Sequence, residues 1–192
     1  MKRLVICCLL LAYSCICKAQ NIQTDLIGKK ISGYIALEES SKSKQYFLSP
    51  IIVGNTDELN YKSKWQGNGD YRIRYTYGKT DSIVSEIHYD WANDKLADLS
   101  DRERERLYTI LYKQYDSLLR KYNEKYGKSK PAGEKDKLKL GQPNVFNRVN
   151  IWQTPSGGQI KMQLFLTNEK WSYEGKEMPP FHRLQVFVKA KP

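Results

Sequence analysis

Cysteine and histidine are scarce in this 192-residue sequence, and their positions exclude several kinds of site. The two histidines are His88 and His182, so a serine triad has few candidate bases. The four cysteines all lie within the first 17 residues. The rest of the chain therefore has no thiol nucleophile, no disulfide and no cysteine-based metal site. No spacing of side chains predicts a metal site or a cofactor.

Long apolar runs are also missing. The main run, residues 4–11, is shorter than the about 20 residues that a transmembrane helix needs. Two basic residues precede it and short side chains lead to Ala19, a pattern typical of a secretory signal. We expect a signal peptide over 1–19 and a single exported domain over 20–192, in the periplasm or outside the cell. A lipid anchor on Cys15 is the alternative, although its flanking residues depart from the usual lipobox.

Catalytic motifs are absent as well. The sequence has no nucleophile elbow, no His-Glu-x-x-His and no phosphate loop with complete glycine spacing. Its 21 acidic residues show no spacing that marks a catalytic pair. These absences favour binding over catalysis and leave a carboxylate-based hydrolase as an alternative.

Positive charge is in excess, with 32 basic residues against 21 acidic ones and a formal net charge of +11. Such an excess favours an acidic partner, although lysine scattered over every segment also serves solubility. Export argues against nucleic acid as that partner. The densest run of lysines belongs to residues 128–143, which we expect to form a flexible loop. No pattern indicates an oligomeric state.

The clearest element is a helix over residues 100–126. Ser100 and Glu103 match a capping box, and Gly127 suits the position after the last helical residue. Apolar residues recur every three or four positions and form one stripe with a polar back, which predicts a helix that packs across a sheet. The stripe consists of Leu107, Leu111, Tyr115, Leu118, Tyr122 and Tyr126.

Strand patterns occur on both sides of this helix. They predict an α+β fold, with a mainly antiparallel sheet of about six to seven strands and the long helix packed across one face. Residues 31–37 and 45–53 have strand character, whereas 55–70 and 168–180 have the composition of loops. Further strands are expected over 71–77, 82–91, 148–154, 159–167 and 183–189.

The strands at 71–77 and 82–91 alternate apolar and polar residues and predict a hairpin. Residues directly opposed in an antiparallel pair point to the same face, so apolar residues should oppose each other. This requirement pairs Ile73 with Ile87.

The polar side of this hairpin carries Glu86, His88 and Asp90 on one strand face. Imidazole and carboxylates together are a candidate metal site. The expected register, however, places Arg74 opposite Glu86 and Arg72 opposite His88. Because arginine disfavours a bound cation, we interpret this face as solvated ion pairs.

A second hairpin is expected between 148–154 and 159–167. A loop with an even number of residues pairs Ile151 with Met162. With this register, the two strands and the strand at 183–189 each place one large aromatic residue on one face of the sheet, and their aliphatic residues lie on the other face. Aromatic surfaces with polar neighbours suit sugar rings or a protein partner. Coverage of this face by the 168–182 loop or by the N-terminal strands is the alternative. The candidate binding residues are Trp152, Phe165, Phe187, Arg148 and Lys161.

The helix end, with Tyr122 and Gly127, is followed by a loop and by a hairpin that carries Trp152 and Thr154. Over residues 100–167 this arrangement resembles small exported α+β proteins of unknown function from Bacteroidetes-type bacteria. The resemblance implies no catalytic residues. We therefore expect an exported, non-catalytic binding module for a glycan or protein partner, with an acidic partner favoured. A protein-binding inhibitor or immunity-type factor is the main alternative.

Overall fold

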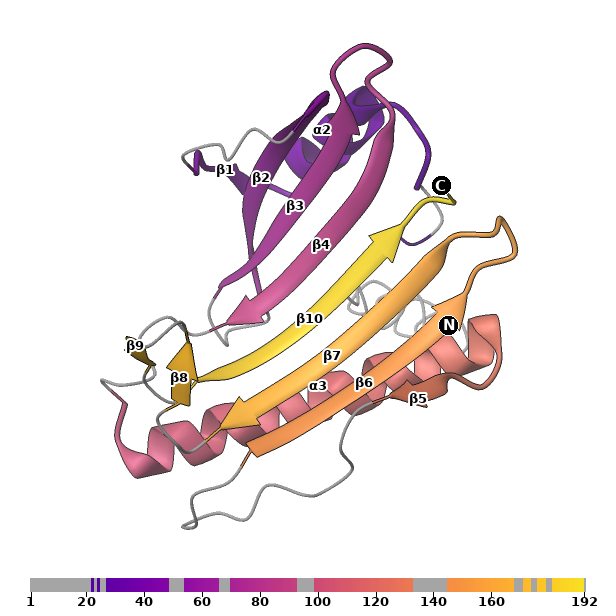
Figure 1. Ribbon diagram of the computed structural model, residues 1–192. Helices are drawn as coiled ribbons and strands as arrows, with labels where there is room; N and C mark the ends of the chain where they lie inside the picture. The colour runs from indigo at the N-terminus through magenta and orange to yellow at the C-terminus, as the bar shows by residue number, and fades with distance from the viewer. Residues whose placement is uncertain are drawn as a thin grey trace, which may run out of the picture.

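The computed structural model describes residues 22, 24, 27–48, 54–65, 70–92, 99–132, 145–167, 171–173, 176–178 and 181–191. The expected signal peptide over 1–19 and Cys15 lie outside these residues. Within them, eight strands form one antiparallel sheet, two more form a small second sheet, and there are two helices (Figure 1). The α+β class and the antiparallel sheet are confirmed, with more strands and one more helix than the sequence indicates.

In chain order the elements are α2 Ile31–Ser40, β1 Lys44–Gln45, β2 Thr56–Lys64, β3 Asp70–Gly78, β4 Val84–Ala92, α3 Asp101–Tyr126, β5 Lys130–Ala132, β6 Val145–Gln153, β7 Gln159–Thr167, β8 Trp171–Tyr173, β9 Lys176–Met178 and β10 His182–Lys189.

The large sheet consists of two halves with the same plan. Its strand order is β1-β2-β3-β4-β10-β7-β6-β5, and every neighbouring pair is antiparallel. Each half contains a helix, a short edge strand and three longer strands, and the small β8–β9 sheet is inserted before the last strand of the second half. The halves meet where β4 pairs with β10, so the centre of the sheet joins segments about a hundred residues apart.

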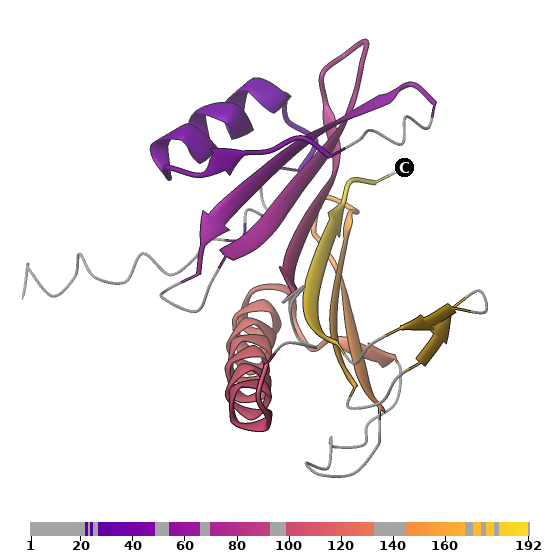
Figure 2. The same ribbon diagram turned by 90° about the vertical axis from the view of Figure 1, so that its left-hand side faces the viewer.

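Both helices cover the same face of the large sheet, and the β8–β9 sheet lies on the other side (Figure 2). The covered face holds the hydrophobic core, because alternate residues of every long strand point toward the helices. Its largest fully buried side chains include Ile73, Tyr75, Ile87, Trp91, Ile160, Met162, Leu164 and Leu166.

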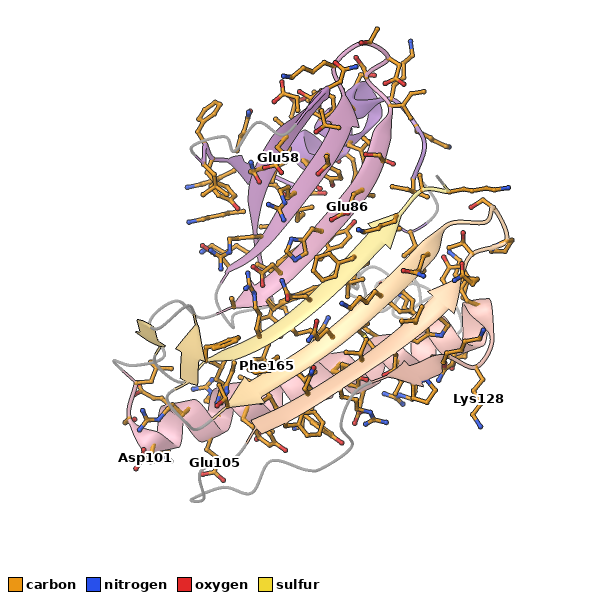
Figure 3. The ribbon with its side chains drawn as sticks, viewed as in Figure 1. Glu58, Glu86, Asp101, Glu105, Lys128 and Phe165 are labelled. Carbon is orange, nitrogen blue, oxygen red and sulfur yellow. The ribbon has the colours of Figure 1, made fainter. Side chains whose placement is uncertain are left out.

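We call the opposite side of the large sheet the open face. The register places the polar alternate residues of β2, β3, β4, β10 and β7 on this side. Figure 3 shows Glu58, Glu86 and Phe165 on the open face, with α3 running behind the sheet. In the described part of the chain, no helix is both long enough and apolar enough to span a bilayer.

Helix α3 follows the sequence prediction closely. The Ser100 hydroxyl accepts a hydrogen bond from the Glu103 backbone N–H, while the Glu103 carboxylate accepts one from the Ser100 backbone N–H. Gly127 follows the helix with a φ of 81°, a left-handed value that glycine adopts without strain. The predicted stripe is buried at Leu111, Tyr115, Leu118 and Tyr122.

The expected strand over 31–37 is wrong, because these residues belong to helix α2. The segment has no apolar stripe: its buried residues are Tyr34 and Glu38, four positions apart. Both contact Tyr75 on β3, through rings 4.9 Å apart and through a 2.5 Å hydrogen bond from the Tyr75 hydroxyl to Glu38 Oε1. Packing of Tyr34 and Glu38 against the sheet therefore makes this segment a helix, although its local residue propensities favour a strand.

Two neighbouring predictions are also corrected. The expected strand over 45–53 is reduced to β1, whose strand residues end at Gln45, and residues 49–53 lie outside the described part of the chain. The expected loop over 55–70 contains β2. Strand β2 has only Leu59 and Tyr61 as apolar residues on its helix side, so its alternation is too short to indicate a strand.

The first predicted hairpin exists, but its register differs by two residues. Arg74 is opposite His88 rather than Glu86, and Ile73 is opposite Tyr89 rather than Ile87. One residue of the shift is present near the turn, where Tyr77 is opposite Val84, and a β-bulge between Thr76 and Tyr77 adds the second. Since two residues are one full period, Glu86, His88 and Asp90 keep their predicted face.

The register of the second hairpin differs by one residue, which turns β6 over. Ile151 pairs with Lys161 and Trp152 with Ile160. The loop between the paired residues Gln153 and Gln159 has an odd number of residues, not the even number that the sequence prediction assumed. A hydrogen bond from the Thr154 backbone N–H to the Gly158 carbonyl holds the loop in this form. Gly157 has a φ of 83°, and Gly158 lies so close to the Lys189 carbonyl that a Cβ atom would clash.

Two expected loops contain short strands. Within 128–143, β5 pairs with β6, and residues 133–144 lie outside the described residues. Within 168–180, β8 pairs with β9.

Candidate functional site

A hollow of about 120 Å³ opens near the centre of the open face, where β2, β3, β4 and β10 lie side by side. Tyr46 and Leu48 line its outer edge. We call it the arginine hollow. Its other lining residues are Asn60, Arg72, Arg74, His88, Asp90 and Arg183.

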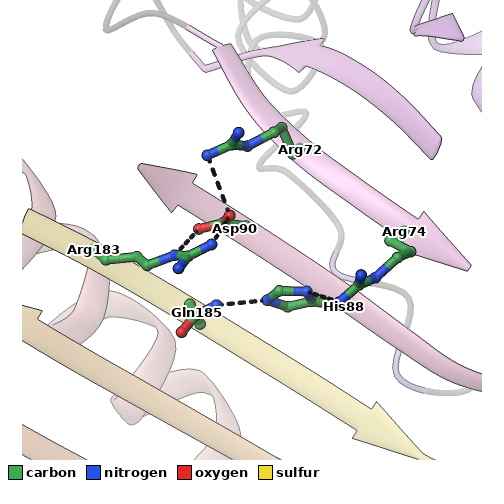
Figure 4. A network of polar contacts seen from close by, with 6 residues as sticks. All are labelled: Arg72, Arg74, His88, Asp90, Arg183 and Gln185. Carbon is green, nitrogen blue, oxygen red and sulfur yellow. Dashed lines mark hydrogen bonds and ion pairs between the residues drawn. The ribbon is translucent and has the colours of Figure 1, made fainter. Parts of the chain in front are cut away.

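Asp90 is the buried anion of this site, with 5 % of its surface exposed. The Arg183 guanidinium binds it with two parallel hydrogen bonds, of 2.9 Å from Nε and 2.7 Å from Nη2 (Figure 4). Arg72 Nη2 lies 3.5 Å from the same carboxylate. Bidentate pairing of this kind fixes the guanidinium plane, so Arg183 is held in place over the sheet.

His88 is the second buried polar group, and it is neutral. Arg74 Nη2 lies 3.1 Å from His88 Nδ1, and because arginine can only donate, Nδ1 is the acceptor. The ring proton is therefore on Nε2, 2.8 Å from the side-chain amide nitrogen of Gln185. The matching acceptor is the amide oxygen, which takes that position when the amide is turned by 180°.

The electrostatic surroundings keep His88 uncharged. Burial is the main reason why its pKa falls to about 4, and the nearby charges of Arg74, Arg183 and Arg72 act in the same direction. The negative charge of Asp90 acts against them. At neutral pH the imidazole is thus a fixed hydrogen-bonding group.

Positive charge exceeds negative charge in the hollow. Three arginines line it, whereas Asp90 is its one lining carboxylate among the described residues. Glu58 lies next to it, with Oε1 3.6 Å from Arg74 Nη1. Even when Glu58 is included, one positive charge is left over. The arginine side chains are 28 % to 37 % exposed, so an incoming anion can reach them.

A second hollow of about 190 Å³ lies beside the first, across β4, β10 and β7. We call it the lysine hollow. Lys189 pairs with Glu86 at 3.0 Å, and Lys161 lies over the Phe187 ring at 5.8 Å. Its lining residues are Glu86, Gln159, Lys161, Phe187 and Lys189.

The predicted aromatic platform is not formed, because Trp152 points to the other side of the sheet from Phe165 and Phe187. Trp152 is 2 % exposed and donates a 3.1 Å hydrogen bond to Asn123 of α3. Arg148 also faces α3, with its guanidinium over the Tyr115 ring at 5.4 Å. The expectation of a shared face was wrong because it depended on the β6–β7 register.

The other three predicted residues lie on the open face. Phe165 stacks on Phe181, with ring centroids 4.8 Å apart. Phe187 and Lys161 both line the lysine hollow. All three side chains are half-buried.

Sequence reasoning identified part of the arginine hollow without recognising it as a site. The alternation of β3 and β4 correctly places Arg72, Arg74, His88 and Asp90 on one face. Sequence reasoning missed Asn60, whose segment was expected to be a loop, and Arg183, which comes from β10 and is 93 positions from Asp90. No local signal gives the pairing of β4 with β10. The metal interpretation of Glu86, His88 and Asp90 gains no support, since no metal-binding cluster occurs among the described residues.

No family model, curated protein or solved structure matches the chain.

Proposed function

We propose that this protein is a non-catalytic binding module that recognises an acidic partner through the arginine hollow of its open face. The observation that carries the proposal is the convergence of three arginines in one hollow that has a single buried carboxylate, so that positive charge predominates among its described lining residues. Arginine in a fixed orientation is well suited to bind carboxylates, because its planar fork matches their geometry.

The hydrogen bonding of the hollow supports binding rather than proton transfer. Both ring nitrogens of His88 have partners, and the Nδ1 lone pair accepts from Arg74. Both oxygens of Asp90 accept from Arg183. A carboxylate-based hydrolase needs a carboxylate free to react, whereas Asp90 and Glu86 are each in an ion pair.

We also propose that residues 1–19 act as a signal peptide that directs export of the protein. A lipid anchor on Cys15 is the alternative. If the partner is a protein, an inhibitor or immunity-type factor is the form that this function takes. The flat, polar open face has the character of a surface for a transient partner, since such interfaces are no more apolar than ordinary protein surface.

The test compares two variants with the same change in net charge. Arg72→Gln/Arg74→Gln removes charge from the hollow, and Arg102→Gln/Arg106→Gln removes it from exposed positions on α3. Binding to poly-L-glutamate is measured at about 50 mM and about 300 mM salt. We expect salt-sensitive binding that the hollow variant loses at least tenfold and the α3 variant keeps. Equal losses in both variants would show that only net charge matters and would overturn the proposal.

A further inference from the structure

We propose that the arginine hollow and the lysine hollow together bind two acidic side chains from one extended segment of a protein partner. This inference rests on the proposed function and adds the class of ligand to it. Because the hollows lie on the same face, separated by a single pair of stacked rings, one segment can reach both.

The divider between the hollows is built from one residue of each. His88 lines the arginine hollow, Phe187 lines the lysine hollow, and their rings stack with 4.2 Å between centroids. The two residues are directly opposed across β4 and β10. A segment that crosses the strands at this point lies over the stacked rings and has one hollow on each side.

The size of each hollow suits a side chain. Small-molecule sites usually measure about 300–1,000 Å³. The two hollows measure about 120 Å³ and about 190 Å³, so neither encloses a cofactor-sized molecule. The end of a glutamate or aspartate side chain fits either of them.

The charges favour a singly charged anion in each hollow. The arginine hollow and Glu58 together leave one positive charge, as counted above. In the lysine hollow, Lys161 and Lys189 face the single carboxylate of Glu86, which again leaves one. Asp90 and Glu86 would repel a doubly charged phosphate, whereas a carboxylate carries one charge and matches the arginine fork.

Asn60 favours a peptide over other polyanions. Its side chain lines the arginine hollow, Asn60 is 6 % exposed, and Oδ1 has no hydrogen-bond donor within reach among the described residues. A buried acceptor without a donor costs about 1–3 kcal/mol. Oδ1 is covered in the free protein, so a rotation of the Asn60 side chain has to bring it to the hollow, where the backbone N–H of an entering peptide can donate to it.

The distance between the hollows sets the spacing of the acidic residues. The first hollow is centred on β3 and β4 and the second on β10, about one and a half strand spacings away. The second is also displaced by about two residues along the strands, so roughly 10 Å separate the hollows. An extended chain advances about 3.3 Å per residue. Side chains two positions apart lie on the same face of an extended chain, so we expect two glutamates at this spacing to spread and reach both hollows.

The experiment uses short peptides with blocked ends that carry one glutamate, or two glutamates two positions apart, in an otherwise uncharged sequence. Binding to the full chain is followed by NMR, through the arginine Nε–H and His88 ring signals. The two-glutamate peptide should bind roughly tenfold more tightly, because its second contact is intramolecular. Lys161→Gln/Lys189→Gln should remove this advantage, so that the two peptides bind this variant equally well. Lys113→Gln/Lys121→Gln, which removes two charges from exposed positions on α3, is the matched control and should keep the advantage.

The outcomes separate the two proposals. If the two-glutamate peptide binds no more tightly than the one-glutamate peptide, the two-hollow inference is overturned while the proposed function stands. If only a sulfated oligosaccharide such as a heparin fragment binds, and the Arg72→Gln/Arg74→Gln variant loses it, the peptide class is wrong and the acidic-partner function stands. If neither probe binds, both proposals fail.

Discussion

The phenyl ring of Phe187 lies almost parallel to the imidazole ring of His88, with 9° between their planes. The two residues come from the two halves of the sheet and meet where β4 pairs with β10. Phe187 covers one face of the imidazole, while Arg74 and Gln185 occupy its two nitrogens. The centre of the open face is thus a packed histidine that is uncharged at neutral pH.

The first prediction concerns pH. The pKa of His88 is about 4 in the folded chain and about 6.5 when unfolded, so between these values only the unfolded state binds the proton. The free energy of unfolding should therefore fall as the pH is lowered from about 6.5 to 4, with a contribution from His88 of roughly 2–3 kcal/mol. His88→Asn keeps an acceptor for Arg74 and removes the titration. Urea denaturation of both proteins at several pH values should show a shallower decline for the variant, and parallel declines would contradict the assignment.

The second prediction concerns Asp90 and Arg183. Arg183→Met leaves a buried carboxylate with only the longer contact to Arg72, so we expect a loss of about 1–3 kcal/mol in the free energy of unfolding. Adding Asp90→Asn should restore part of this loss, because the uncompensated charge is removed. Lys64→Met breaks an exposed ion pair and should cost less than about 1 kcal/mol. The measurement is urea denaturation, analysed as a double-mutant cycle.

The third prediction tests the orientation of β6. Trp152→Ala removes a buried ring beneath α3 and should cost about 3–5 kcal/mol, whereas Phe165→Ala on the open face should cost about 1–2 kcal/mol. If Trp152→Ala does not fold, Trp152→Phe retains the ring, loses the hydrogen bond to Asn123 and should cost about 1 kcal/mol. Comparable costs for the two alanine variants would place Trp152 at the surface and contradict the register.

The fourth prediction concerns the attachment of α2. Tyr75 donates a hydrogen bond to Glu38, and both side chains are buried, at 0 % and 3 % exposure. Tyr75→Phe leaves the Glu38 carboxyl without this donor, and we expect a loss of about 1–3 kcal/mol in the free energy of unfolding. Combining it with Glu38→Gln should cost less than the sum of the two single changes. Additive costs would mean that the two residues do not act together.

Local interactions determined what the sequence alone could predict. Helix α3 has its capping box at Ser100 and Glu103, its stripe and its final glycine within one continuous segment, so each feature is complete without the rest of the chain. The faces of Arg74 and His88 were also predictable, because alternation along a strand survives a register change of two residues.

The tertiary structure decided the orientation of β6 and the composition of the site. A register change of one residue reverses every side chain of a strand, and only contacts with α3, such as Trp152 with Asn123, select one orientation. Arg183 reaches Asp90 because β10 inserts between β4 and β7. That pairing depends on how the two halves of the sheet meet, and no pattern within either half encodes it.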